Sequence, residues 1–151
     1  MNTQSRIQHS LNDLIEIARD GKDFYVEAAG KVKDAELAAL FTRIAAVKQD
    51  IVTRLSGVVA ATGGEPSDHG TMVGSIHQLY TRIRAALGDT EYGYVAELEE
   101  SEDRLLHAFT ETIDDRDTPA AVRTEAQALL PQVRECHDVM RNRKHALDAS
   151  R

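Results

Sequence analysis

The chain has 151 residues and a formal net charge of −7 at pH 7, a length that suits one domain with its own core and an acidic balance that gives no basic surface for nucleic acid. No apolar run approaches the roughly 20 residues that span a bilayer, and the N-terminus MNTQSRIQHS lacks the apolar segment of a secretory signal, so we expect no membrane association. Cys136 is the single cysteine, which excludes an internal disulfide and favours a cytoplasmic location.

The first expected elements are two helices, over about residues 5–32 and 35–61. Asp34 precedes Glu36 and Leu37 and is a suitable N-cap for the second helix. The turn between the helices is therefore very short, and we expect them to pack as antiparallel neighbours. Apolar or small residues recur on the first helix at alternating steps of four and three, which places them on one face: Ile7, Leu11, Leu14, Ala18, Gly21, Tyr25, Ala28 and Val32.

The second helix is expected to end at TGGEPSDHG (62–70), where glycines and a proline interrupt the pattern. A short helix over about 71–87 and a third long helix over about 90–115 follow. DDRDTPA (114–120) predicts a turn, with Thr118 as N-cap and Pro119 at the first position of a last helix over about 119–147. Pro131 lies inside that helix and is expected to kink it.

Four long helices and one short helix, without a strand candidate, predict an all-α four-helix bundle formed by residues 1–151 as a single domain. The connection between the second and third long helices contains the short helix. Two helical hairpins joined by one long crossover are the arrangement of ferritin-like bundles, so we expect a ferritin-like fold.

Three segments together resemble a known family: LNDLIEIARDGKDFYVEAA (11–29), GGEPSDHG with GSIHQLY (63–80), and EESEDRLLHAF (99–109). They are similar to the ferritin-like four-helix-bundle proteins that are grouped in proteobacteria as a domain of unknown function. The resemblance implies a bacterial protein with a ferritin-like fold and no established activity.

The wider ferritin-like superfamily contains di-iron proteins, whose second helix reads roughly Phe-x-x-Ile/Ala-Ala-x-x-Glu-x-x-His. This chain is similar at Phe41, Ile44 and Ala45. It then has Lys48 at the position of the Glu ligand and Ile51 at the position of the His ligand. The comparison implies that this helix cannot supply its share of a di-iron site.

The other helices keep little more of the ligand set that the resemblance implies. Ala18 stands at the Glu position of the first helix, and Arg134 stands three residues before His137 on the last. Glu102 retains a carboxylate on the third long helix. Glu102 and His137 are therefore the remaining metal-ligand candidates.

Lys48 has two interpretations. In the first, the buried seam of its helix runs through Ile44 and Val47, so that Lys48 lies at the flank and its ammonium reaches water. In the second, Lys48 pairs with Glu102 across the bundle, and a buried ion pair occupies the vacated metal position.

Other residues offer weaker candidates for a site. On the expected short helix, His77 and Tyr80 either fix that helix by hydrogen bonding or line a pocket. His107 and Glu111 are four residues apart, as in a surface metal pair, but two ligands make a weak site. Cys136 falls on the apolar seam of the last helix and is expected in the core.

The sequence favours a non-catalytic, self-associating bundle without a cofactor, for which a stress-related role is one option. We expect a homodimer or a higher homo-oligomer, because symmetric dimers are the commonest assemblies of soluble proteins. Two alternatives stay open. One is a metalloprotein that holds iron, manganese or zinc at an altered carboxylate/His site around Glu102 and His137. The other is a small-molecule-binding module that uses the crossover helix with His77 and Tyr80.

Overall fold

The protein is an all-α bundle, in agreement with the fold class that the sequence predicts. The computed structural model describes residues 2–71, 83 and 90–150. In this part of the chain there are four helices and no strand: α1 (Thr3–Lys31), α2 (Ala35–Ala61), α4 (Thr90–Asp114) and α5 (Ala120–Ala149). The short helix expected over 71–87 lies almost entirely outside the described residues, as do His77 and Tyr80.

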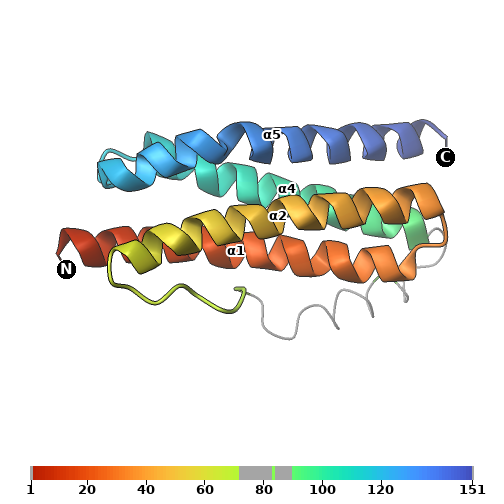
Figure 1. Ribbon diagram of the computed structural model, residues 1–151. Coiled ribbons are helices and arrows are strands. Elements are labelled where there is room, and N and C mark those ends of the chain that lie inside the picture. Colours follow the sequence, from red (N-terminus) through yellow and green to blue (C-terminus); the bar gives the residue numbers. More distant parts are fainter. Residues whose placement is uncertain (1, 72–82, 84–89, 151) are drawn as a thin grey trace.

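The helices form two antiparallel hairpins, α1 with α2 and α4 with α5 (Figure 1). α1 also packs against α4, which joins the hairpins into one bundle. α2 and α4 run in the same direction (Figure 1). α5 runs antiparallel to α2, and these two helices lie along one face.

The helix boundaries follow local capping chemistry. Asp34 caps α2, because its carboxylate accepts hydrogen bonds from the backbone nitrogens of Glu36 at 2.9 Å and Leu37 at 3.1 Å. The expected cap of α5 at Thr118 is wrong: Pro119 occupies the cap position and makes no side-chain cap bond. Its ψ of 143° is extended, so the helix begins one residue later than the proline pattern predicts. α5 then continues through Pro131 without interruption.

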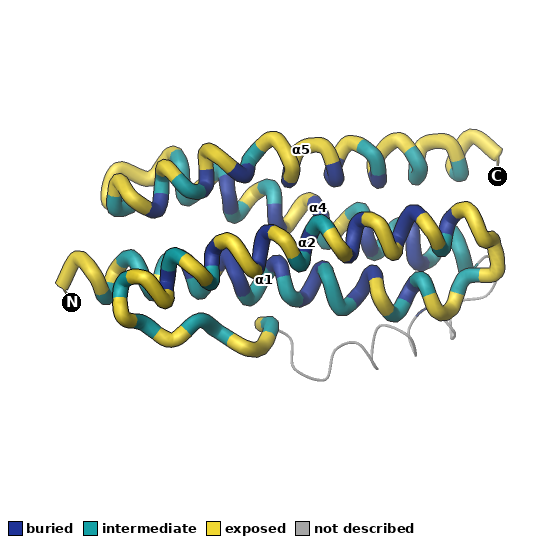
Figure 2. The backbone as a smooth tube through the Cα atoms, viewed as in Figure 1, coloured by how far each residue is buried: buried dark blue, intermediate teal, exposed yellow. Residues whose placement is uncertain are grey.

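Buried residues recur along all four helices (Figure 2), and the buried apolar side chains form two clusters along the bundle. The first cluster consists of Phe24, Tyr25, Ala28, Leu37, Leu40, Phe41, Ile44, Ala45, Ile83, Tyr94, Val95, Leu98, Cys136 and Met140. The second consists of Leu11, Leu14, Ile15, Ala18, Ile51, Val52, Leu55, Val59, Leu105, Phe109, Val122, Ala126, Leu129 and Val133. On α2 the clusters are separated by Lys48, and on α4 they are separated by Glu102.

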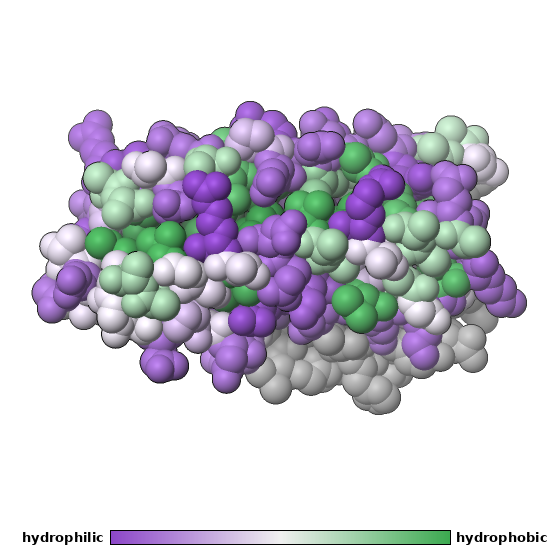
Figure 3. Space-filling model, viewed as in Figure 1, coloured by the Kyte–Doolittle hydropathy of each residue, from purple (hydrophilic) through white to green (hydrophobic). Residues whose placement is uncertain are grey.

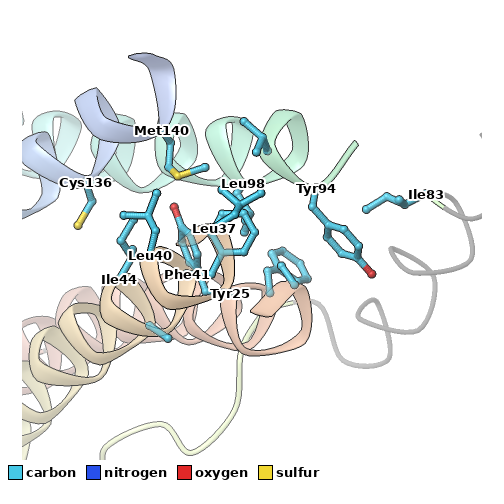
Figure 4. Packing of buried hydrophobic residues seen from close by; sticks show 14 residues of the cluster. Tyr25, Leu37, Leu40, Phe41, Ile44, Ile83, Tyr94, Leu98, Cys136 and Met140 are labelled. Carbon is cyan, nitrogen blue, oxygen red and sulfur yellow. The ribbon is translucent and has the colours of Figure 1, made fainter. Parts of the chain in front are cut away.

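Side chains from all four helices build the first cluster, which contains Tyr25, Phe41, Leu98 and Met140 (Figure 4). Tyr25 and Phe41 meet edge to face, with ring centroids 5.8 Å apart and an interplanar angle of 63°. This geometry is the one that the charge distribution of aromatic rings favours. None of the described helices combines the length and apolar character that crossing a membrane requires.

Candidate functional site

One polar or sulfur-containing side chain from each helix approaches the level that separates the two apolar clusters. These residues, the central polar layer, are Tyr25 of α1, Lys48 of α2, Glu102 of α4 and Cys136 of α5. The side chains of Lys48 and Glu102 are each only 1% exposed, although both carry ionisable groups. Burial of such groups is expensive unless they are paired, so their partners determine what the layer does.

Glu102 is the centre of the layer, and both of its carboxylate oxygens have protein donors. Lys48 Nζ donates to Glu102 Oε1 in a direct ion pair. Tyr25 Oη donates to Glu102 Oε2 at 3.0 Å. The structure thus brings Lys48 and Glu102 together, and the interpretation in which the Lys48 ammonium reaches water does not hold. α2 buries a face wide enough to include both Ile44 and Lys48, while Val47 is only partly buried.

Burial and the charge of Glu102 set the protonation of the surrounding groups. Burial raises the pKa of the Tyr25 hydroxyl well above its usual value, and the adjacent Glu102 carboxylate raises it further. Burial also raises the pKa of the Cys136 thiol, an effect that the Lys48 ammonium partly offsets. Tyr25 therefore remains a hydrogen-bond donor at neutral pH. Cys136 remains a thiol, which is a much weaker nucleophile than the thiolate.

His137 belongs to a different set of contacts, at the edge of the bundle. Its Nε2 lies 2.6 Å from Asp103 Oδ1, and its Nδ1 lies 3.1 Å from Asp138 Oδ1. The partners of Glu102 are instead Lys48 and Tyr25, so the two metal-ligand candidates share no partner. Within residues 2–71, 83 and 90–150, no group of three or more His, Cys, Asp and Glu side chains is arranged to hold a metal ion.

The remaining candidate is the exposed pair of His107 and Glu111 on α4. His107 Nε2 lies 3.0 Å from Glu111 Oε2, and both side chains are largely exposed. The two residues form the i,i+4 pair that their spacing predicts. An exposed pair of this kind contributes little to stability and is a weak metal site.

A groove runs between α2 and α5 on the face that Figure 3 shows, where patches of hydrophobic side chains are bordered and interrupted by hydrophilic ones. Its volume is about 250 Å³. Cys136 belongs both to this α2–α5 groove and to the central polar layer. The residues that line the groove are Leu40, Arg43, Ile44, Val47, Gln132, Glu135, Cys136 and Val139.

Polar side chains of α1 hold the start of the crossover, a feature that the sequence reasoning missed. Gln8 Nε2 donates to the carbonyl oxygen of Thr62 at 3.0 Å. Asn12 binds the next turn of the segment twice, because its Nδ2 donates to the Glu65 carbonyl at 3.1 Å and its Oδ1 accepts from the Ser67 nitrogen at 2.8 Å.

The same row continues along α1. Glu16 accepts from the Ser67 hydroxyl at 2.6 Å, and Arg19 Nε donates to the Ser67 carbonyl at 3.0 Å. Buried Asp20 accepts from both the backbone nitrogen and the hydroxyl of Thr71. We call these contacts the α1 clasp; its members are Gln8, Asn12, Glu16, Arg19 and Asp20. Their spacing of about one helical turn was the available signal, but such a row is also typical of a solvated helix face.

Comparison with known protein families matches residues 6–115 to the family described as Domain of unknown function (DUF2383). The match covers α1, α2 and α4, and therefore includes Tyr25, Lys48 and Glu102 but not Cys136 or His137. No curated protein matches the chain.

Proposed function

The chain belongs to the DUF2383 family of domains of unknown function, and we propose that it is a non-catalytic, self-associating helical bundle that keeps an ion pair at its centre in place of a metal. The observation that carries this proposal is the Lys48–Glu102 pair, in which each side chain is 1% exposed. A cation is already present there as the Lys48 ammonium.

The contacts of Glu102 support a site without a metal. A carboxylate that binds a metal ion directs a lone pair at it, whereas Glu102 Oε1 is already paired with the Lys48 ammonium and Glu102 Oε2 accepts the Tyr25 hydroxyl. The ammonium of Lys48 would repel an incoming cation at short range. The alternative metal site around Glu102 and His137 has less support, because His137 is directed at Asp103 and Asp138 instead.

The hairpin–crossover–hairpin arrangement supports a ferritin-like scaffold. A single long connection between two parallel helices is the feature that separates ferritin-like bundles from simple up-and-down bundles. In this proposal the scaffold is retained and the position of its metal is taken by Lys48. The unpaired thiol of Cys136 agrees with a reducing compartment such as the cytoplasm.

Elemental analysis tests the metal-free centre. Protein purified without a histidine tag is soaked with iron, manganese or zinc, desalted, and measured for bound metal. We expect far less than one metal ion per chain. Stoichiometric metal that disappears in Glu102→Gln would overturn the proposal, whereas metal that persists in that variant would be located at another site, such as the exposed His107–Glu111 pair.

Sedimentation velocity over a range of protein concentrations tests self-association. We expect a concentration-dependent shift from monomer to dimer. A protein that sediments as a monomer at every concentration contradicts this part of the proposal and leaves the metal-free centre intact.

A further inference from the structure

We propose that the α2–α5 groove is the surface through which two copies of this chain associate, with a two-fold axis parallel to the helices and Arg43 of each copy opposite Glu135 of the other. This inference rests on the self-association proposed above and names its surface. Three observations carry it: an apolar groove, ion pairs that flank the groove on both sides, and two opposite charges between them that have no ion-pair partner among the described residues.

The groove is apolar in its walls and charged at its rim. Leu40, Ile44, Val47 and Val139 supply the apolar part. α2 and α5 contact each other far less than either contacts its own hairpin partner, which leaves the space between them open. Covering such a groove with the same face of a second molecule removes apolar surface from water and favours association.

Ion pairs bridge α2 and α5 on either side of the groove. Arg143 Nη2 lies 3.4 Å from Glu36 Oε1 toward one end of the bundle. Arg54 Nε lies 3.0 Å from Glu125 Oε2 toward the other. Together these pairs define the antiparallel register of the two helices.

That register places Arg43 and Glu135 at the same level, on opposite rims of the groove. They line the groove, but neither forms an ion pair with another described residue. On either side of the groove the charged residues of α2 and α5 pair within the chain. At the groove itself, Arg43 and Glu135 present one positive and one negative charge to the outside. Complementary charges of this kind fix the orientation of a partner.

A second copy satisfies both charges if the two-fold axis runs along the groove. Rotation about such an axis places α2 of one copy over α5 of the other and preserves the level along the bundle. Arg43 then faces Glu135 of the second copy, and the symmetry creates the same contact twice, as in every isologous interface. An axis across the helices, centred on the groove, would instead bring the two Arg43 side chains together.

Charge reversal tests the interface in the full chain. Sedimentation equilibrium compares the wild type with Arg43→Glu, with Glu135→Arg and with the double variant. Each single change puts like charges at both symmetric contacts, so we expect the dissociation constant of the dimer to rise at least about tenfold. The double variant restores opposite charges and should return the constant close to the wild-type value. Arg116→Glu, on the exposed turn before α5, is the matched control for a change of net charge.

Each outcome supports or overturns a defined statement. A dimer that both single variants weaken and the double variant restores supports the interface. A dimer that the charge changes do not affect overturns it but leaves self-association standing, through another face. A wild type that remains a monomer overturns both proposals.

Thiol labelling gives an independent readout, because Cys136 lies in the groove. In the proposed dimer, its labelling rate falls as protein concentration rises through the dissociation constant. A rate that is independent of concentration, in a protein that dimerises, overturns the interface.

Discussion

Replacement of Lys48 with methionine should lower the free energy of unfolding by ~3–5 kcal/mol, the cost of leaving one partner of a buried ion pair alone. Methionine retains most of the aliphatic length of lysine, so the change removes the charge with little loss of packing. Glu102 would keep only the 3.0 Å bond from Tyr25. Because both members of the pair are 1% exposed, water does not screen the remaining charge, and the smaller values typical of surface pairs do not apply.

Removal of the second charge should reverse most of this loss. In Lys48→Met/Glu102→Leu no buried charge remains, and what persists is the Tyr25 hydroxyl without its acceptor, a deficit of about 1–3 kcal/mol. The double variant is therefore expected to be more stable than Lys48→Met alone. Addition of Tyr25→Phe removes the last unmatched group and should bring the triple variant close to the wild type.

Urea unfolding monitored by circular dichroism measures these differences, if the dependence on urea is the same in each variant. Glu102→Gln is a useful second single variant, because it keeps the shape of the side chain and leaves the Lys48 ammonium without a negatively charged partner. Equal, small losses in Lys48→Met and in the double variant would refute the reasoning. In that case the pair would be as weakly coupled as one at the surface.

Four further changes test other contacts. The pKa of Tyr25 is higher in the folded than in the unfolded chain, so the stability that Tyr25 contributes is intact below pH ~10 and falls at higher pH. Tyr25→Phe should therefore reduce the decrease of the urea midpoint above that pH, and an unchanged decrease would contradict this prediction. Gly21→Ala should stabilise the protein by about 0.5–1 kcal/mol, because glycine is unfavourable inside a helix and the added Cβ would meet Ser101 Oγ at an ordinary contact distance of 3.5 Å. A lower melting temperature than that of the wild type would contradict this prediction. Gly70→Ala should instead detach the crossover, because a Cβ there would overlap a carboxylate oxygen of Asp20, and faster proteolysis of residues 62–71 than in wild type is the readout. Asp34→Ala should cost about 0.5–2 kcal/mol through loss of the α2 cap, measured by thermal unfolding.

The fold class was predictable because the apolar spacing of each long helix agrees with its caps and turns. Asp34 marks the start of α2, and its side chain makes the capping bonds that the sequence indicates. Thr118 was misassigned because proline is tolerated both at the cap and at the first helical position. The sequence does not decide between these positions, whereas the extended ψ of Pro119 does.

The centre of the bundle was less predictable, because two helical seams one residue apart fit α2 almost equally well. Only the packing of four helices determines whether the buried face extends to Lys48 or to Val47. The face extends to Lys48 because α2 packs closely on α1 and Lys48 meets Glu102 of α4. The α1 clasp was missed for a related reason. Asn12 and Glu16 bind the irregular segment after α2, and the periodicity of apolar residues does not predict the path of a segment without regular structure.

The position of the central polar layer between two apolar clusters has a consequence for how the helices choose their alignment. Apolar contacts are not directional, and a helix that slides by one turn exchanges one set of leucines and valines for another at modest cost. The same slide would separate Lys48 from Glu102 and bury two isolated charges. The central polar layer therefore specifies one axial register of α2 relative to α4. This specificity does not depend on a net gain in stability, because replacing both charges with apolar residues can leave the total stability unchanged.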